Sequence, residues 1–119
     1  MDLLSDLEFR GQLYQNTDPE GLAKRLAQGG TTAYIGFDPT ADSLTVGNLA
    51  TVMLLRRVQQ AGHRAIALVG GGTGLIGDPS GKAEERSLNT AETVAAYTAK
   101  VQCELERFLD FDGDNAAVM

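Results

Sequence analysis

The stretch YIGFDPTADSLTVGNLATVMLLRR, from Tyr34 to Arg57, decides the fold. It begins with β-branched and aromatic residues that predict a strand over 33–37, and it continues through a turn dense in Asp and Thr. Apolar residues at helical spacing then predict a helix from Val46 to Ala61. A strand, a polar turn and a helix start in this order are typical of a nucleotide site, because the first turn of a helix presents free N–H groups that favour phosphate.

A second strand and a second loop follow this stretch. The run RAIALVG, from Arg64 to Gly70, has the length of a strand, and its unbroken apolarity predicts that the strand is covered on both faces. The glycine-rich loop GGGTGLIGDPSGK occupies 70–82, and we expect a last helix capped by Asn89 after it. The order strand, helix, strand predicts an α/β fold, a Rossmann-like parallel sheet built on a βαβ unit with flanking helices.

Helices are also expected before the first strand. Leucines at helical spacing predict an amphipathic helix within 2–13. In TDPEGLAKRLAQGG, Thr17 is the predicted cap, and the glycine pair at 29–30 ends the helix. We therefore expect residues 1–30 to form N-terminal helices and residues 31–119 to form a nucleotide-binding αβ unit.

Composition limits the classes of function. The 119 residues suit one domain, and the net charge of −6 argues against a large basic surface for nucleic acid. We expect no secretory leader, no membrane span and a cytoplasmic location. The single cysteine, Cys103, is expected to be a buried structural thiol, and the single histidine, His63, a surface or capping residue. One Cys and one His cannot assemble a zinc site or a Cys–His nucleophile, so no metal site is expected.

The two loops carry the candidate chemistry. Ligands of parallel sheets bind past the carboxyl ends of the strands, so both loops are expected to border one crevice. In the first loop, a helix start near Val46 favours phosphate, and Gly47 leaves room for a ribose or a purine ring. The alternative is that Asp42 and Ser43 only cap the helix and that Gly47 eases packing.

The second loop differs from the common phosphate signatures. Lys82 is followed by Ala83, so the P-loop ending is absent, and GTGLIG is a weak dinucleotide match. Asp78 in a wide glycine backbone suits a ligand with an ammonium group, although it could simply cap a turn. Lys82 and Arg86 lie four residues apart and could meet phosphates or form a solvated face.

Two long motifs carry a family resemblance. YIGFDPTADSLTVGNL and AGHRAIALVGGGTGLIGDPSGKAEERSLN resemble the N-terminal catalytic half of bacterial tyrosyl-tRNA synthetases. This resemblance implies a class I synthetase that joins tyrosine to AMP, with Mg-ATP as substrate and no bound cofactor, and then passes tyrosine to tRNA(Tyr). It also implies a homodimer for the full-length enzyme. Such activation needs positioning and charge stabilisation, not a nucleophile.

The resemblance also implies roles for individual residues. The expected tyrosine-binding residues are Tyr34, Gly36, Thr73 and Asp78. The expected ATP-binding residues are Asp38, Thr40, Thr45, Gly47 and Asn48, and the expected catalytic residues are Thr40, Thr45, Asn48, Lys82 and Arg86. The family's ATP signature usually reads His-Ile-Gly-His, so Thr45 and Asn48 depart from it at both ends.

The chain stops at Met119, whereas the family continues with a second lysine-rich loop, a dimer surface and an anticodon-reading part. We therefore expect half of an active site, poorly active alone. One alternative is a non-catalytic βαβ nucleotide-binding or scaffold module. Another is a dinucleotide-dependent oxidoreductase, which lacks a convincing ribose-binding acid after the glycines.

Overall fold

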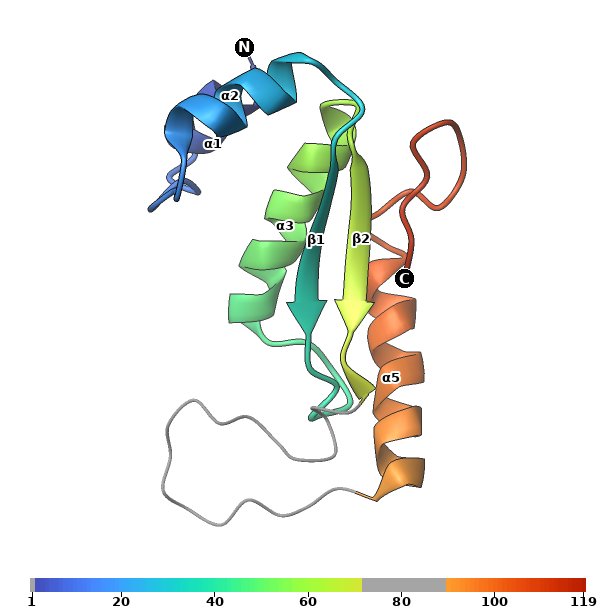
Figure 1. Cartoon of the computed structure of the whole chain (residues 1–119). Coiled ribbons are helices and arrows are strands. Elements are labelled where there is room, and N and C mark those ends of the chain that lie inside the picture. The colour runs from blue at the N-terminus through green and yellow to red at the C-terminus, as the bar shows by residue number, and fades with distance from the viewer. Residues whose placement is uncertain (1, 72–89) are drawn as a thin grey trace.

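The structure is a computed structural model that describes residues 2–71 and 90–119. Helices and strands alternate after an N-terminal helical pair (Figure 1). Their bounds are α1 Leu3–Phe9, α2 Pro19–Ala27, β1 Thr32–Phe37, α3 Val46–Gln60, β2 Arg64–Val69 and α5 Ala91–Leu105. The predicted α/β order is confirmed, and the first helix is shorter than the expected 2–13 span.

The two strands are parallel and in register over their whole length. Thr32 pairs with Arg64 at one end, and Phe37 pairs with Val69 at the other. Beyond the last pair, the Gly70 N–H donates to the Phe37 carbonyl at 2.9 Å. The carboxyl ends of both strands therefore lie at the same edge of the sheet, as the βαβ prediction requires.

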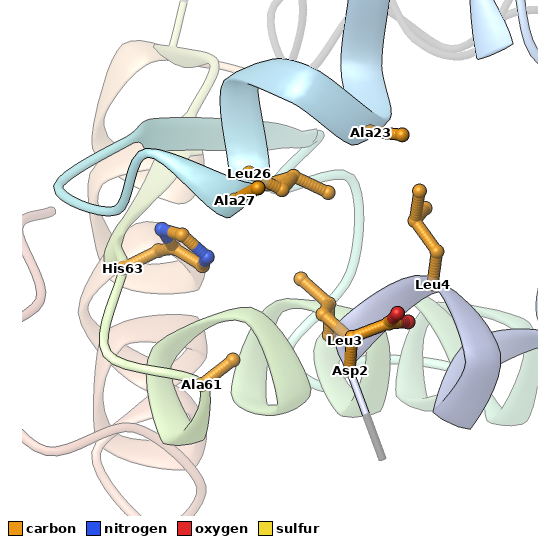
Figure 2. Close-up of a pocket in the computed structure, with 8 residues that line it drawn as sticks. All are labelled: Asp2, Leu3, Leu4, Ala23, Leu26, Ala27, Ala61 and His63. Carbon is orange, nitrogen blue, oxygen red and sulfur yellow. The ribbon is translucent and has the colours of Figure 1, made fainter. Parts of the chain in front are cut away.

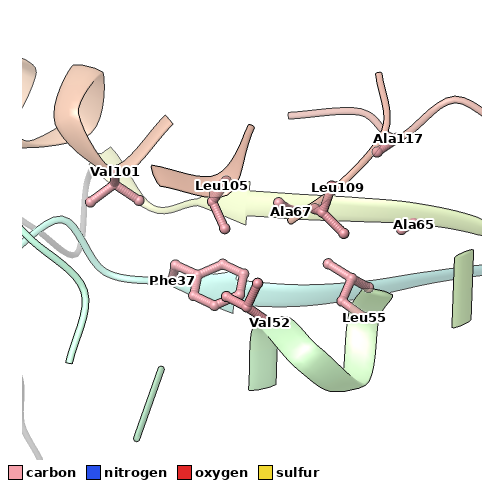
Figure 3. Packing of buried hydrophobic residues seen from close by; sticks show 9 residues of the cluster. All are labelled: Phe37, Val52, Leu55, Ala65, Ala67, Val101, Leu105, Leu109 and Ala117. Carbon is pink, nitrogen blue, oxygen red and sulfur yellow. The ribbon is translucent and has the colours of Figure 1, made fainter. Parts of the chain in front are cut away.

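One face of the sheet packs against helices and forms the core (Figure 3). Side chains alternate across a strand, so Phe37 on β1 and Ala65 and Ala67 on β2 point to the same side. Val52 and Leu55 of α3 reach this face and are fully buried. The other buried members of the cluster come from the C-terminal third of the chain, and they are Val101, Leu105, Leu109 and Ala117.

The opposite face of the sheet is open among the described residues. Tyr34 lies beside Ile66 and Gly36 beside Leu68, and Tyr34 and Leu68 are 70% and 53% exposed. The prediction that the second strand is covered on both faces is therefore wrong for the described part of the chain. Unbroken apolarity along a strand therefore does not by itself show that both of its faces are covered.

The C-terminal segment returns along the free edge of β2. Val118 forms a parallel bridge with Ile66, donates to the Ala65 carbonyl at 3.0 Å and accepts from the Ala67 N–H at 2.8 Å. The composition of this segment, DFDGDNAAVM, is rich in Asp and does not itself indicate a strand. Its backbone takes the place of a third strand at one position of the sheet.

A glutamine on α3 holds this segment in place. The Gln59 amide donates to the Asp110 carbonyl at 2.6 Å and accepts from the Asp110 N–H at 2.9 Å. The Asn115 side chain donates to the carbonyls of Gln59 and His63, at 2.9 and 3.1 Å. Gln59 is buried, and these bonds satisfy its polar atoms.

Two helix caps differ from the prediction by one residue. Asp18, not Thr17, caps α2, because its carboxylate accepts from the Gly21 N–H and Pro19 takes the first helical position. Thr90 caps α5 by accepting from the Thr93 N–H at 3.1 Å, whereas the predicted cap, Asn89, lies outside the described residues.

The expected environments of His63 and Cys103 are reversed. His63 is 4% exposed, and its Nδ1 accepts from the Thr31 N–H at 3.3 Å. It follows Gly62, whose φ of +91° turns the chain sharply from α3 into β2 and carries the imidazole inward. Cys103 is exposed, because α5 turns Val101 and Leu105 toward the core and leaves position 103 on the other side.

Candidate active-site edge

The first loop, 38–45, leaves the carboxyl end of β1 and enters α3. It starts with a tight turn in which the Thr40 N–H donates to the Asp38 carbonyl at 2.9 Å. Pro39 is fully buried, whereas Asp38 is exposed and Thr40 is half-buried. The loop therefore anchors itself through Pro39 and presents its polar groups outward, beside the chain that leaves β2 at Gly70.

Thr45 and Asn48 form a reciprocal capping box at the start of α3. The Thr45 hydroxyl accepts from the Asn48 N–H at 3.2 Å, and the Asn48 side-chain oxygen accepts from the Thr45 N–H at 3.0 Å. The hydroxyl also donates to that oxygen at 2.9 Å. Thr45, and not Asp42 or Ser43, is therefore the helix cap, which corrects the alternative interpretation of this loop.

Gly47 lies in the first turn of α3 and is exposed. Within the described part of the chain, a Cβ atom there would meet only the Thr45 hydroxyl, at an ordinary 3.6 Å, so packing of these residues does not demand glycine. The missing side chain leaves open space in front of the helix start. The open space favours the interpretation that Gly47 lets a ligand approach the backbone closely, over the interpretation that it eases packing.

Tyr34 and Gly36 lie on the open face of β1, close to the same edge. Tyr34 is not a core residue, because its ring stands on the uncovered side of the sheet. Among the described residues, a Cβ on Gly36 would meet no atom within 4 Å, so the strand surface at Gly36 is open there. These three residues border one exposed surface that leads to the first loop.

Four predicted site residues are not placed by the structure. Thr73, Asp78, Lys82 and Arg86 lie outside the described residues, and the second loop is described only to Gly71. The structure places the other predicted site residues on β1, in the first loop and in the first turn of α3, and they are Tyr34, Gly36, Asp38, Thr40, Thr45, Gly47 and Asn48.

Two side chains of α5 that the sequence analysis did not single out contact the first loop. The Glu104 carboxylate accepts from the Leu44 N–H with both oxygens, at 3.2 and 3.3 Å. The Lys100 ammonium lies 3.6 Å from the Asp42 carboxylate, and both side chains are largely exposed. The two contacts join residues 60 and 58 positions apart, so no local sequence pattern could indicate them.

A partly enclosed cavity of about 310 Å³ lies at the opposite end of the sheet (Figure 2). Its walls come from α1, α2 and the turn after α3, and they are Asp2, Leu3, Leu4, Ala23, Leu26, Ala27, Ala61 and His63. None of the predicted site residues lines it. The cavity lies where the N-terminal helices α1 and α2 meet the end of α3 and the start of β2.

Asp2 at the rim of this cavity has a local role. Its carboxylate caps α1 by accepting from the Ser5 N–H at 2.8 Å. This hydrogen bond lowers the pKa of Asp2 from its ordinary value of 3.8.

Within 2–71 and 90–119, no group of three or more His, Cys, Asp or Glu side chains is arranged to hold a metal ion. Over the same residues, no helix combines the length and apolarity needed to cross a bilayer. The polar groups at the carboxyl edge are the hydroxyls of Thr40 and Thr45, the amide of Asn48, the carboxylate of Asp38 and the N–H groups at the start of α3.

Residues 26–118 match the family described as tRNA synthetases class I (W and Y), and the chain belongs to that family. Its parallel sheet and flanking helices are part of a Rossmann-like α/β domain. Relatives include the tyrosine–tRNA ligase of Bacillus caldotenax, 61% identical over 114 residues, which are 96% of this chain and 27% of that protein. The tyrosine–tRNA ligase 1 of Bacillus cereus strain ATCC 10987 is 57% identical over 120 residues, 100% of this chain and 29% of that protein.

A solved structure has the same fold. The C-terminally truncated mitochondrial tyrosyl-tRNA synthetase of Coccidioides posadasii superposes with a TM-score of 0.74 at 32% identity, over 90% of this chain and 28% of that one. The chain therefore spans less than a third of the length of these relatives.

Proposed function

We propose that this chain forms the ATP- and tyrosine-binding half of a tyrosine–tRNA ligase active site. The parallel register of β1 and β2 carries the proposal, because it places the first loop and the start of the second loop at one edge. The names of the relatives, all tyrosine–tRNA ligases or tyrosyl-tRNA synthetases, support tyrosine as the amino acid.

In this proposal the start of α3 binds ATP. The free N–H groups and the positive dipole end of the helix favour phosphate, and exposed Gly47 lets the adenosine lie close to the backbone. Asn48 keeps its side-chain NH₂ group for ATP, because its oxygen is used in the capping box. Asp38 and Thr40 border the same surface.

Tyrosine would lie along the open face of β1. The Tyr34 hydroxyl is exposed and can donate to the phenol oxygen of the substrate. Gly36 leaves room for the substrate ring over the strand. Thr73 and Asp78 remain predictions for the amino-acid end of the substrate.

The chemistry follows from these placements. The tyrosine carboxylate attacks the α-phosphorus of Mg-ATP and displaces pyrophosphate, so a tyrosyl-adenylate forms without a covalent enzyme intermediate. The chain would contribute by aligning the two substrates and by stabilising charge on the phosphates. Lys82 and Arg86 are the predicted cations for the leaving pyrophosphate.

The proposal also covers the division of the chain and the properties of the whole enzyme. Residues 1–30 would form a helical cover, and residues 31–119 the nucleotide-binding unit. tRNA(Tyr) as acceptor, a homodimer and a cytoplasmic location would belong to the whole enzyme, of which the relatives suggest that this chain corresponds to the first part.

Calorimetric titration with a non-hydrolysable tyrosyl-adenylate analogue tests the proposal. The matched control is the phenylalanyl analogue, which differs only by the phenol hydroxyl. The proposal predicts tighter binding of the tyrosyl analogue, and tyrosine-dependent exchange of pyrophosphate into ATP in any form of the protein that carries the complete site. Equal binding of both analogues, or no binding of either, would instead indicate a non-catalytic module.

A further inference from the structure

Glu104 of α5 has a position that its own helix does not explain. It is the penultimate residue of α5, where the negative end of the helix dipole disfavours a carboxylate. α5 also has no basic residue in its last turn to offset that charge. The partner of Glu104 lies in another element.

That partner is the backbone of the first loop. The Leu44 N–H donates to both Glu104 oxygens, at 3.2 and 3.3 Å, in a partly buried setting. Leu44 itself packs against the core, and the capping residue Thr45 follows it directly. The carboxylate therefore holds the backbone immediately before α3, close to the positive end of that helix.

Few other contacts of the described residues fix this part of the loop. The Lys100–Asp42 pair lies one turn away on the same helix, but its two side chains are 61% and 65% exposed, and exposed pairs hold a conformation weakly. The capping-box hydrogen bonds at the helix entrance are local, so they do not connect this part of the loop to α5. Glu104 makes the long-range connection.

We propose that Glu104 is a positioning residue for nucleotide binding. It would hold Leu44 so that Thr45, Gly47 and Asn48 present a preformed helix start to ATP. This inference rests on the proposed function, which supplies the ATP. It adds a residue from outside both sequence motifs, acting through the loop backbone and not through contact with the nucleotide.

Three variants separate positioning from charge and from general stability. Glu104→Gln keeps an acceptor oxygen and removes the charge, whereas Glu104→Ala removes the acceptor. Glu106→Ala removes an equal charge two positions further on, from an exposed residue with no contact to the loop. All binding is measured well below the melting temperature of the least stable variant.

The first measurement is the affinity for the tyrosyl-adenylate analogue. For Glu104→Ala we expect the Kd to rise about tenfold, the equivalent of one hydrogen bond to a charged group. Glu104→Gln and Glu106→Ala are expected to stay within about twofold of the unmodified chain, since Gln retains the acceptor. A Glu104→Ala protein that is less stable but binds with unchanged Kd would show a purely structural role and overturn the proposal.

The second measurement is amide hydrogen exchange at Leu44 and Thr45, which needs no ligand. Faster exchange at both amides in Glu104→Ala alone supports positioning, and unchanged exchange overturns it. If the unmodified chain does not bind the analogue, the proposed function fails, and the exchange data still decide whether Glu104 positions the loop.

Discussion

Thr45 and Asn48 cap each other across the first turn of α3, with the Thr45 hydroxyl 3.2 Å from the Asn48 backbone nitrogen and the Asn48 oxygen 3.0 Å from the Thr45 nitrogen. Both polar side chains, which the sequence predicts to contact ATP, therefore stabilise the start of the helix itself. At the two positions where the resemblance predicts histidines, this chain has a Thr and an Asn that bond each other through the Asn48 oxygen, so the capping box does not use the Asn48 NH₂ group.

Replacing Thr45 by Ala is expected to destabilise the chain by about 1 kcal/mol, because the first turn of α3 loses its cap. The measurement is urea unfolding followed by circular dichroism. Thr45→Ser is the matched control and should retain most of the stability, since serine provides the same hydroxyl. Equal loss in both variants would mean that the methyl group, and not the cap, is responsible.

Tyr34→Phe should separate binding from stability. The hydroxyl stands on an open surface, so its removal is expected to change the free energy of unfolding by less than about 0.5 kcal/mol. Binding of the tyrosyl-adenylate analogue should weaken on the order of tenfold, because the phenol of the ligand loses its partner. Unchanged affinity would remove Tyr34 from the proposed tyrosine site.

Gln59→Ala is expected to release the C-terminal return. The variant leaves the backbone N–H and carbonyl of Asp110, which meet Gln59 in a partly buried setting, without that partner, at a cost of roughly 1–3 kcal/mol. Hydrogen exchange at Ala67, whose N–H donates to Val118, should rise at the same time. Gln60→Ala removes the same side chain from the exposed neighbouring position and should leave both measurements nearly unchanged.

Leu55→Ala tests the core directly. Leu55 is fully buried between α3 and the sheet, and its truncation is expected to cost roughly 2–5 kcal/mol. Leu49 lies two turns earlier on α3 and is 39% exposed, so Leu49→Ala should cost clearly less. Similar losses in the two variants would show that α3 packs through a different face.

The cap of α1 should respond to acid. Because the Ser5 N–H lowers the pKa of Asp2 below 3.8, the ionised cap stabilises α1 above pH 3.8, and this stabilisation is lost as the pH falls through the lowered value. The Ser5 amide shift in nuclear magnetic resonance spectra should titrate there. Asp2→Asn caps without titrating, so an identical titration in that variant would contradict the assignment.

Much of the αβ unit could be predicted from local patterns. The first strand was expected over 33–37 and is found at Thr32–Phe37, and the helix was expected to start at Val46, where α3 does start. Strand residues, turn residues and helical periodicity act over a few positions, so a single sequence displays them. The shared edge of the two strands followed from chain connectivity alone.

What escaped prediction depends on contacts between distant residues. The burial of His63 comes from Thr31 and Asn115, which lie 32 and 52 positions away. The return of the C-terminal segment depends on Gln59, and the hold on the first loop depends on Glu104. Gln and Glu are common on the exposed faces of helices. The sequence spacing of Gln59 and Glu104 therefore does not reveal their contacts before the fold is known.

The position of Val118 beside Ile66 decides where this sheet can be extended. Val118 is hydrogen-bonded to the middle of the outer edge of β2. The edge of β1 that faces away from β2 has no neighbouring strand among the described residues. A further strand in this sheet would therefore find a free backbone edge along β1, Thr32–Phe37. Such a strand would widen the open face of the sheet, on which Tyr34 stands.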